Sequence, residues 1–108
     1  MDTCTMKIEV TAFRNDKDND LESISASIGV PIESDREVIR KMVDNKELTV
    51  HAVEALYNLV SSIRPNWLDN KDTRLKIETH VNGYKWLSCS GHVTMKPEGF
   101  IFDPLRAN

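Results

Sequence analysis

Apolar and polar residues alternate along the first third of the chain, which is the pattern of half-buried β-strands. The alternation runs over residues 5–14, stops at the polar stretch 15–20 and resumes over residues 21–30. The apolar positions are Met6, Ile8, Val10 and Ala12, followed by Ile24, Ala26, Ile28, Val30 and Ile32. The pattern predicts a β-hairpin with a long polar tip, and Pro31 is expected to end its ladder.

Helical spacing replaces the alternation after this hairpin. Ser34-Asp35-Arg36-Glu37 matches a capping box, in which the Ser hydroxyl and the Glu carboxylate satisfy amides at a helix start, so we expect a helix over residues 35–44. Apolar side chains then recur three or four positions apart from Val50 to Ile63, just ahead of Pro65. They predict a second helix.

The C-terminal third returns to alternation and contains the strongest turn signal. Residues 75–81 lead into Asn82-Gly83, which favours a type I′ turn because both positions accept a positive φ. The expected cross-strand pairs are Val81 with Tyr84, Thr79 with Trp86, and Ile77 with Ser88. This register places Tyr84 and Trp86 on the core side and Leu87 and Cys89 on the opposite face, with a last strand expected over Gly99–Phe102.

The predicted order of elements is strand, strand, helix, helix, strand, strand, strand. Consecutive strands joined by tight turns favour an antiparallel sheet. We therefore expect one α+β domain over residues 1–108, with two layers: a sheet of four or five strands and two helices on one face. The order of the strands within the sheet does not follow from local patterns.

Composition and charge narrow the function classes. The 108 residues are 40% hydrophobic and 29% charged, which is ordinary for a water-soluble domain with one modest core. The net charge of −3, from 14 basic and 17 acidic residues, argues against general affinity for a polyphosphate. No apolar run approaches the roughly 20 residues that span a bilayer, and the N-terminal residues lack the pattern of a signal peptide, so we expect no membrane contact and a cytoplasmic location.

Two candidate metal sites are not supported by the sequence. The acidic stretch Asp16–Asp20 opens like a calcium-binding loop, but Leu21 stands where that loop needs glycine and Ser27 stands where it needs a bidentate glutamate. A zinc site built on His80, Cys89 and His92 would need all three close together. In the expected register Lys76 lies opposite Cys89, so His80 and Cys89 are separated by roughly 13 Å along the ladder. We expect no metal or other cofactor.

Catalytic motifs are also missing. The segment Ser88–His92 holds two serines, a cysteine and a histidine, but it lacks the glycine-flanked elbow that exposes a nucleophile. The four glycines are scattered rather than gathered in a phosphate-binding loop. These observations disfavour an enzyme.

The leading hypothesis is a small non-enzymatic protein-binding module. Its candidate contact residues are Asp16, Asp18, Asp20, Arg64 and Trp67, which combine an acidic hairpin tip with an aromatic side chain beside an arginine. The acidic tip would suit a partner with a basic surface, and an edge strand could pair two copies of the chain. Small acidic domains of this kind are often inhibitory or accessory proteins of bacteria or phages. For Trp67 the alternative is packing against the sheet edge or a helix end.

Two other function classes remain open. A nucleic-acid-binding domain would use Lys7, Lys76, Lys85 and His80 on the exposed sheet face, although the net charge makes this class less favoured. A small enzyme would need a pocket that brings His51, His80 or His92 to a carboxylate.

Overall fold

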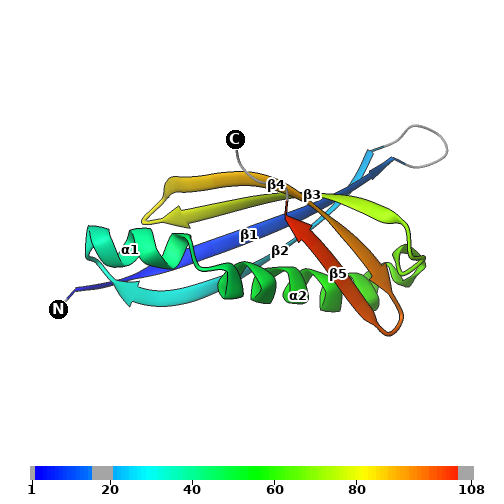
Figure 1. The fold of residues 1–108 in the computed structure, drawn as a ribbon, viewed down its shortest axis with the longest axis horizontal. Coiled ribbons are helices and arrows are strands. Elements are labelled where there is room, and N and C mark those ends of the chain that lie inside the picture. The colour runs from blue at the N-terminus through cyan, green and yellow to red at the C-terminus, as the bar shows by residue number, and fades with distance from the viewer. Residues whose placement is uncertain (1, 16–20, 105–108) are drawn as a thin grey trace.

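The computed structural model describes residues 2–15 and 21–104, and these confirm the expected two-layer α+β fold. The elements are β1 (Thr3–Asn15), β2 (Leu21–Glu33), α1 (Arg36–Val43), α2 (Lys46–Ile63), the 3-10 helix η1 (Pro65–Trp67), β3 (Asp72–Val81), β4 (Tyr84–Lys96) and β5 (Gly99–Pro104). The five strands form one antiparallel sheet in the order β2-β1-β3-β4-β5. Both helices lie along the same side of this sheet (Figure 1). No helix within the described residues is long and apolar enough to cross a membrane.

The core lies between the sheet and the two helices, and β1 supplies its longest buried row. Because side chains alternate between the faces of a strand, one face of the interior strand β1 supplies a continuous apolar row, while the other face carries mostly polar groups together with Phe13. The apolar stripe of α2 packs against this row and against β2. The buried residues that define this layer are Met6, Ile8, Val10 and Ala12 in β1, Ile39 and Val43 in α1, and Ala52, Val53, Leu56 and Val60 in α2.

The start of α1 differs from the predicted capping box. Asp35, not Ser34, is the N-cap: its Oδ1 accepts the amide hydrogens of Glu37 at 2.9 Å and Val38 at 3.3 Å. A carboxylate at this position also interacts favourably with the positive end of the helix dipole. The amide of Ser34 instead donates to the carbonyl of Asp2 at 3.0 Å.

The start of α2 comes earlier than the apolar pattern predicted. Asn45 caps it by accepting the amide hydrogen of Glu47 at 2.9 Å, so the helix begins at Lys46 rather than near Val50. The predicted start rested on the apolar residues from Val50 onward, whereas the first turn, Lys46–Thr49, has a single apolar residue, Leu48, which also packs against the core.

Pro31 does not end its strand, which corrects the prediction. β2 continues to Glu33, and Pro31 lies opposite Thr5. Because β2 is an edge strand, a proline can turn its nitrogen away from β1 without losing a ladder hydrogen bond.

The β3–β4 hairpin has the expected turn but a different register. Asn82 and Gly83 both have positive φ, and Val81 pairs with Tyr84 as predicted. The register then shifts by one residue, so that Trp86 is the extra residue of a β-bulge. Thr79 lies opposite Leu87, and Ile77 lies opposite Cys89.

The exposure of the β4 side chains differs from the prediction. The bulge accounts for the difference from Trp86 onward, whereas Tyr84 keeps its predicted pairing with Val81. Tyr84 is 75% exposed and Trp86 is 38% exposed, so the prediction that both lie in the core is wrong. Leu87 and Cys89 are partly buried and pack against the core, where the predicted register had them facing outward. The shift aligns them with the apolar residues farther along β4, which must face the helices.

Candidate functional site

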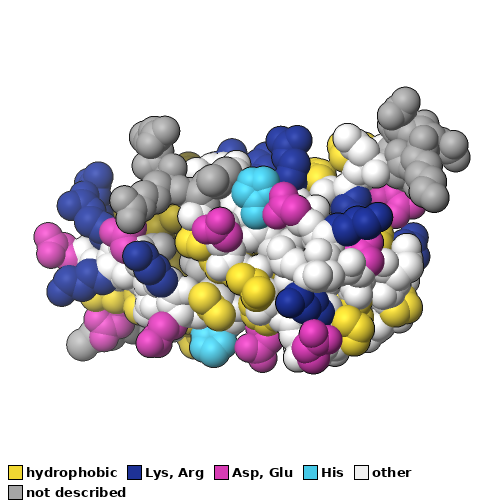
Figure 2. Space-filling model, turned by 45° about the vertical axis from the view of Figure 1, so that its right-hand side comes forward, with side chains coloured by type: hydrophobic (Ala, Val, Ile, Leu, Met, Phe, Trp, Pro, Cys, Tyr) yellow, Lys and Arg dark blue, Asp and Glu magenta, His cyan; other side chains and the backbone are white. Residues whose placement is uncertain are grey.

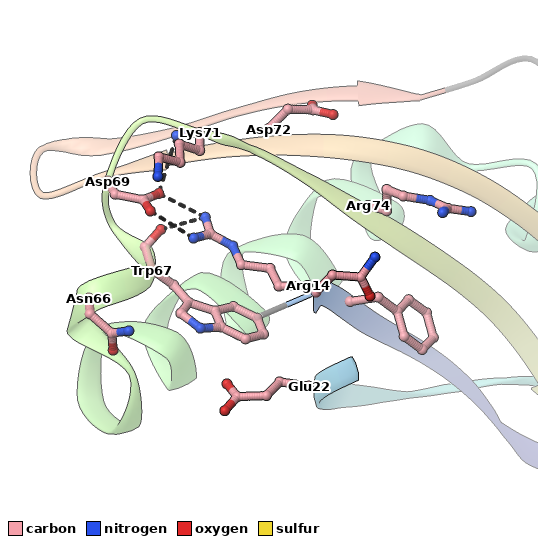
Figure 3. Close-up of a pocket in the computed structure, with 10 residues that line it drawn as sticks. Arg14, Glu22, Asn66, Trp67, Asp69, Lys71, Asp72 and Arg74 are labelled. Carbon is pink, nitrogen blue, oxygen red and sulfur yellow. Dashed lines mark hydrogen bonds and ion pairs between the residues drawn. The ribbon is translucent and has the colours of Figure 1, made fainter. Parts of the chain in front are cut away.

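Arg14 organises the end of the molecule where the β1–β2 hairpin leaves the sheet (Figure 3). Its Nη1 and Nη2 donate to the two carboxylate oxygens of Asp69 at 2.8 and 2.9 Å. Its Nε donates to Thr73 Oγ1 at 2.9 Å, and Nη2 also donates to the carbonyl of Trp67 at 2.9 Å. The bidentate pair and the two further hydrogen bonds join β1 to the loop before β3 and to β3 itself.

Trp67 lies under this network. The chain turns into η1 at Pro65, and the indole ring is carried into the core, where it is only 3% exposed. The Arg14 guanidinium lies 5.1 Å from the centre of the ring, which adds a cation–π interaction. The packing alternative for Trp67 is confirmed, and its side chain has almost no surface to offer a partner.

The Arg14 hydrogen bonds lower the pKa of Asp69, and the amide of Lys71, which donates to the same carboxylate, lowers it further. A carboxylate with a lowered pKa in the folded state stabilises the fold above its unfolded pKa, and this stabilisation is lost as the pH falls through the folded value.

We therefore expect the free energy of unfolding to fall on acidification below about pH 4, the ordinary pKa of an aspartate. The variant Asp69→Asn should show a shallower dependence in this range and an unchanged dependence above about pH 5. Urea unfolding at a series of pH values measures both slopes. Parallel curves for the two proteins below pH 4 would contradict the assignment.

A cleft of about 530 Å³ opens beside the Arg14 network. Its walls come from the base of the β1–β2 hairpin, from η1 and from the start of β3 (Figure 3). The charged and amide side chains that line it are Arg14, Asn15, Glu22, Asn66, Asp69, Lys71, Asp72 and Arg74. Both signs of charge are present, so the cleft as a whole has no preference for an anion or a cation.

A second hollow, of about 430 Å³, adjoins the cleft on the face of the sheet that the helices leave open. Phe13 and Arg74 line both spaces. The strand register places Phe13 of β1, Arg74 of β3 and His92 of β4 in one row across the sheet. His92 Nδ1 lies 2.7 Å from Asp72 Oδ2, which is hydrogen-bond distance.

The sequence-predicted contact residues are only partly brought together. Arg64 is exposed at the end of α2, and its Nε lies 3.9 Å from Glu22 Oε2 at the base of the hairpin, close to buried Trp67. Asp16, Asp18 and Asp20 lie outside the described residues. Arg14 was not singled out from the sequence, although this residue forms the central hydrogen bonds of the site. Its position continues the apolar row Met6, Ile8, Val10 and Ala12, and a charged residue in such a row could have indicated a buried ion pair.

The lysines of the nucleic-acid hypothesis lie on the open face, but each is close to a carboxylate. Lys7 Nζ lies 3.4 Å from Glu9, and the Nζ atoms of Lys76 and Lys85 lie 3.7 and 2.9 Å from Glu78. The hydrogen bond from Lys85 lowers the pKa of Glu78, which keeps that carboxylate charged. Basic and acidic side chains are interspersed on the surface seen in Figure 2. This arrangement lacks the basic stripe on which phosphate-backbone binding depends.

The enzyme hypothesis gains a histidine–carboxylate pair, His92 and Asp72. His51 is exposed on α2, on the other side of the sheet from His80 and His92. Within the described residues, no hydrogen bond joins His92 to a serine or cysteine, as a nucleophile and its base require. Burial raises the pKa of the Cys89 thiol, which opposes formation of a reactive thiolate.

The zinc candidates stay apart. Cys89 lies opposite Ile77 and not opposite Lys76 as predicted, and it faces the helices whereas His92 faces the open side. Across residues 2–15 and 21–104, no three histidine, cysteine or acidic side chains are grouped so that they could hold a metal ion.

Comparison with known proteins provides no relative. No protein-family model matches the chain, and neither a curated protein nor a solved structure matches it significantly.

Proposed function

We propose that this protein is a non-enzymatic protein-binding module whose partner pairs with the free edge of β4. One observation carries the proposal. β5 pairs with β4 only between Gly91 and Lys96, so among the described residues the segment Tyr84–Ser90 has β3 on one side and no strand on the other. The unpaired amide and carbonyl groups of such an edge are a template for a strand of another chain.

The side chains of this free edge support protein binding. Tyr84 and Trp86 are large, amphipathic and exposed, and residues of these two types dominate the binding energy of many protein interfaces. The bulge at Trp86 turns the indole away from the core, and bulges near sheet edges commonly re-aim side chains in this way. Leu87 and Cys89 add a partly buried apolar surface next to the edge.

The opposite edge of the sheet is better protected against pairing. β2 carries Pro31, which cannot donate to a ladder, and its ends carry Glu22 and Glu33. The one charged side chain of the β4 edge is Lys85, and its ammonium group is bound to Glu78 at 2.9 Å. The free segment of β4 is therefore less guarded than the β2 edge, while β5 is the edge strand of the sheet beside the rest of β4.

Other parts of the proposal rest on the sequence. The acidic tip residues Asp16, Asp18 and Asp20 would extend the contact toward a basic surface of the partner. An inhibitory or accessory role in a bacterium or phage is proposed on the size and acidic charge of the chain alone. Cys4 and Cys89 are free thiols, which is typical of a reducing compartment and supports a cytoplasmic location.

The test compares an edge variant with a matched control. The double variant Tyr84→Ser/Trp86→Ser should weaken binding to a partner captured from the native host by more than about tenfold, because truncating an interface anchor commonly costs over 1 kcal/mol. The control is Ile101→Ser, which removes an exposed apolar side chain from β5 and should leave the affinity unchanged. Affinities are measured with the purified partner.

Hydrogen exchange identifies the paired strand. On binding, the amides of Tyr84–Ser90 should gain protection, while those of β2 should not. Protection confined to β2, or equal losses of affinity in the edge variant and the control, would contradict the proposal. Concentration-dependent protection of the same amides in the protein alone would identify a second copy of the chain as the partner.

A further inference from the structure

The hollow on the open face of the sheet gathers groups that suit an oxyanion. In the first row across the strands, Arg74 stands between Phe13 and His92. In the next row, Lys76 stands opposite Ser90. Guanidinium, imidazole, ammonium and hydroxyl groups are the usual hydrogen-bond donors to phosphate oxygens.

Arg74 is the cation of this hollow that remains available. It is exposed, and among the described residues no carboxylate lies within ion-pair distance of it, whereas Lys76 is 3.7 Å from Glu78. Its side chain extends away from the Arg14–Asp69 pair (Figure 3). A guanidinium presents two parallel donors in a plane, a geometry that matches phosphate oxygens.

His92 is held in place by its acidic neighbour. The hydrogen bond from Nδ1 to Asp72 orients the ring, and within the described residues Nε2 has no hydrogen-bond partner. Asp103, which lies across from His92 on β5, is the carboxylate of this row, whereas Asp72 belongs to the neighbouring row opposite Thr94. Asp72 is engaged by His92, so its charge opposes an anion less than a free carboxylate would.

Phe13 gives the site an apolar wall. It is half-buried, lines the hollow and is the cross-strand neighbour of Arg74. The volume of about 430 Å³ falls within the size range of small-molecule sites.

We infer that this hollow binds the phosphate group of an aromatic phosphate monoester, with Arg74 and His92 contacting the phosphate and Phe13 beside the aromatic part. The hollow borders the β4 edge, since Ser88, Cys89 and Ser90 line it. The residues proposed to contact the ligand, Arg74, His92 and Phe13, lie outside Tyr84–Ser90, so the inference does not depend on the proposed protein-binding function. The variants that block the edge, Tyr84→Ser/Trp86→Ser, should leave this site unchanged.

The test uses phenyl phosphate, inorganic phosphate and phenol as ligands, with binding followed by amide chemical shifts. Phenyl phosphate should give saturable shifts in Arg74, His92 and Phe13, inorganic phosphate should bind more weakly, and phenol should not bind. The variant Arg74→Gln should weaken phenyl phosphate binding at least about tenfold, because it removes the charge-assisted hydrogen bonds. Phe13→Leu should reduce the affinity to that of inorganic phosphate.

A matched variant removes the same charge elsewhere. Arg36→Gln, at an exposed position on α1, should bind phenyl phosphate as the parent protein does. His92→Gln is a second variant of the site and should weaken binding several-fold, which keeps the test decisive if Arg74→Gln perturbs the fold. Absence of saturable shifts, phenol binding as tightly as phenyl phosphate, or equal losses in Arg74→Gln and Arg36→Gln would overturn the inference.

Discussion

Replacing Arg14 with methionine is expected to lower the free energy of unfolding by about 3 kcal/mol. Methionine keeps much of the aliphatic volume but removes every donor of the guanidinium. Asp69 then loses its bidentate partner, and Thr73 Oγ1 and the carbonyl of Trp67 lose hydrogen bonds in a part-buried environment. The Arg14 side chain is only 16% exposed, so water does not restore these interactions fully.

Urea unfolding of Arg14→Met measures this loss. The control is Arg36→Met, which makes the same substitution at an exposed position on α1 and should change the free energy by less than about 0.5 kcal/mol. A similar small change in both variants would mean that the Arg14 network contributes little, and that the hairpin end is held by Trp67 packing alone.

Replacing Leu56 with alanine should also cost about 3 kcal/mol. Leu56 is fully buried in the middle of α2, where the helix packs on β1 and β2. Removing its methyl groups takes away apolar burial and leaves a cavity that the sheet and helix can close only in part. The size of the effect therefore reports directly on how tightly the two layers pack.

The control for Leu56→Ala lies on the same helix. Ile63 is the last residue of α2 and is 48% exposed, so Ile63→Ala should cost less than about 1 kcal/mol. Both values come from chemical denaturation with far-ultraviolet circular dichroism. If Leu56→Ala were as mild as Ile63→Ala, α2 could not be the layer that covers the sheet.

The residues of the candidate site could be predicted only in part from local sequence patterns. Trp67 and Arg64 were predicted to contact a partner because an aromatic residue lies close to an arginine in the sequence. Both residues lie near the base of the β1–β2 hairpin. Arg14, 53 positions before Trp67 in the chain, connects Trp67 to β1. Its other partners, Asp69 and Thr73, carry no pattern of their own. Such a network depends on which strands become neighbours, and that depends on the whole sheet.

In the β3–β4 hairpin, local patterns predict the turn but not the strand register beyond it. The Asn82-Gly83 turn was predictable because positive φ at two consecutive residues is a local requirement. The predicted and observed registers share the pair Val81–Tyr84. Beyond it, the predicted register places Trp86 on the core side, and the observed one places Leu87 and Cys89 there. The helices contact β2, β1 and β5 most. The observed register places Leu87 and Cys89 on the same face of β4 as Val93 and Met95, so that all four side chains pack in or against the core.

The sequence by itself determined the kinds of elements, their order and the two-layer packing, because strand alternation, helical spacing and turn chemistry are properties of neighbouring residues. Only the tertiary structure decided the strand order, the bulge that exposes Trp86, the burial of Trp67 and the rows that unite Phe13, Arg74 and His92. These features arise from contacts between segments far apart in the chain, whose free energies depend on how all the layers are packed together.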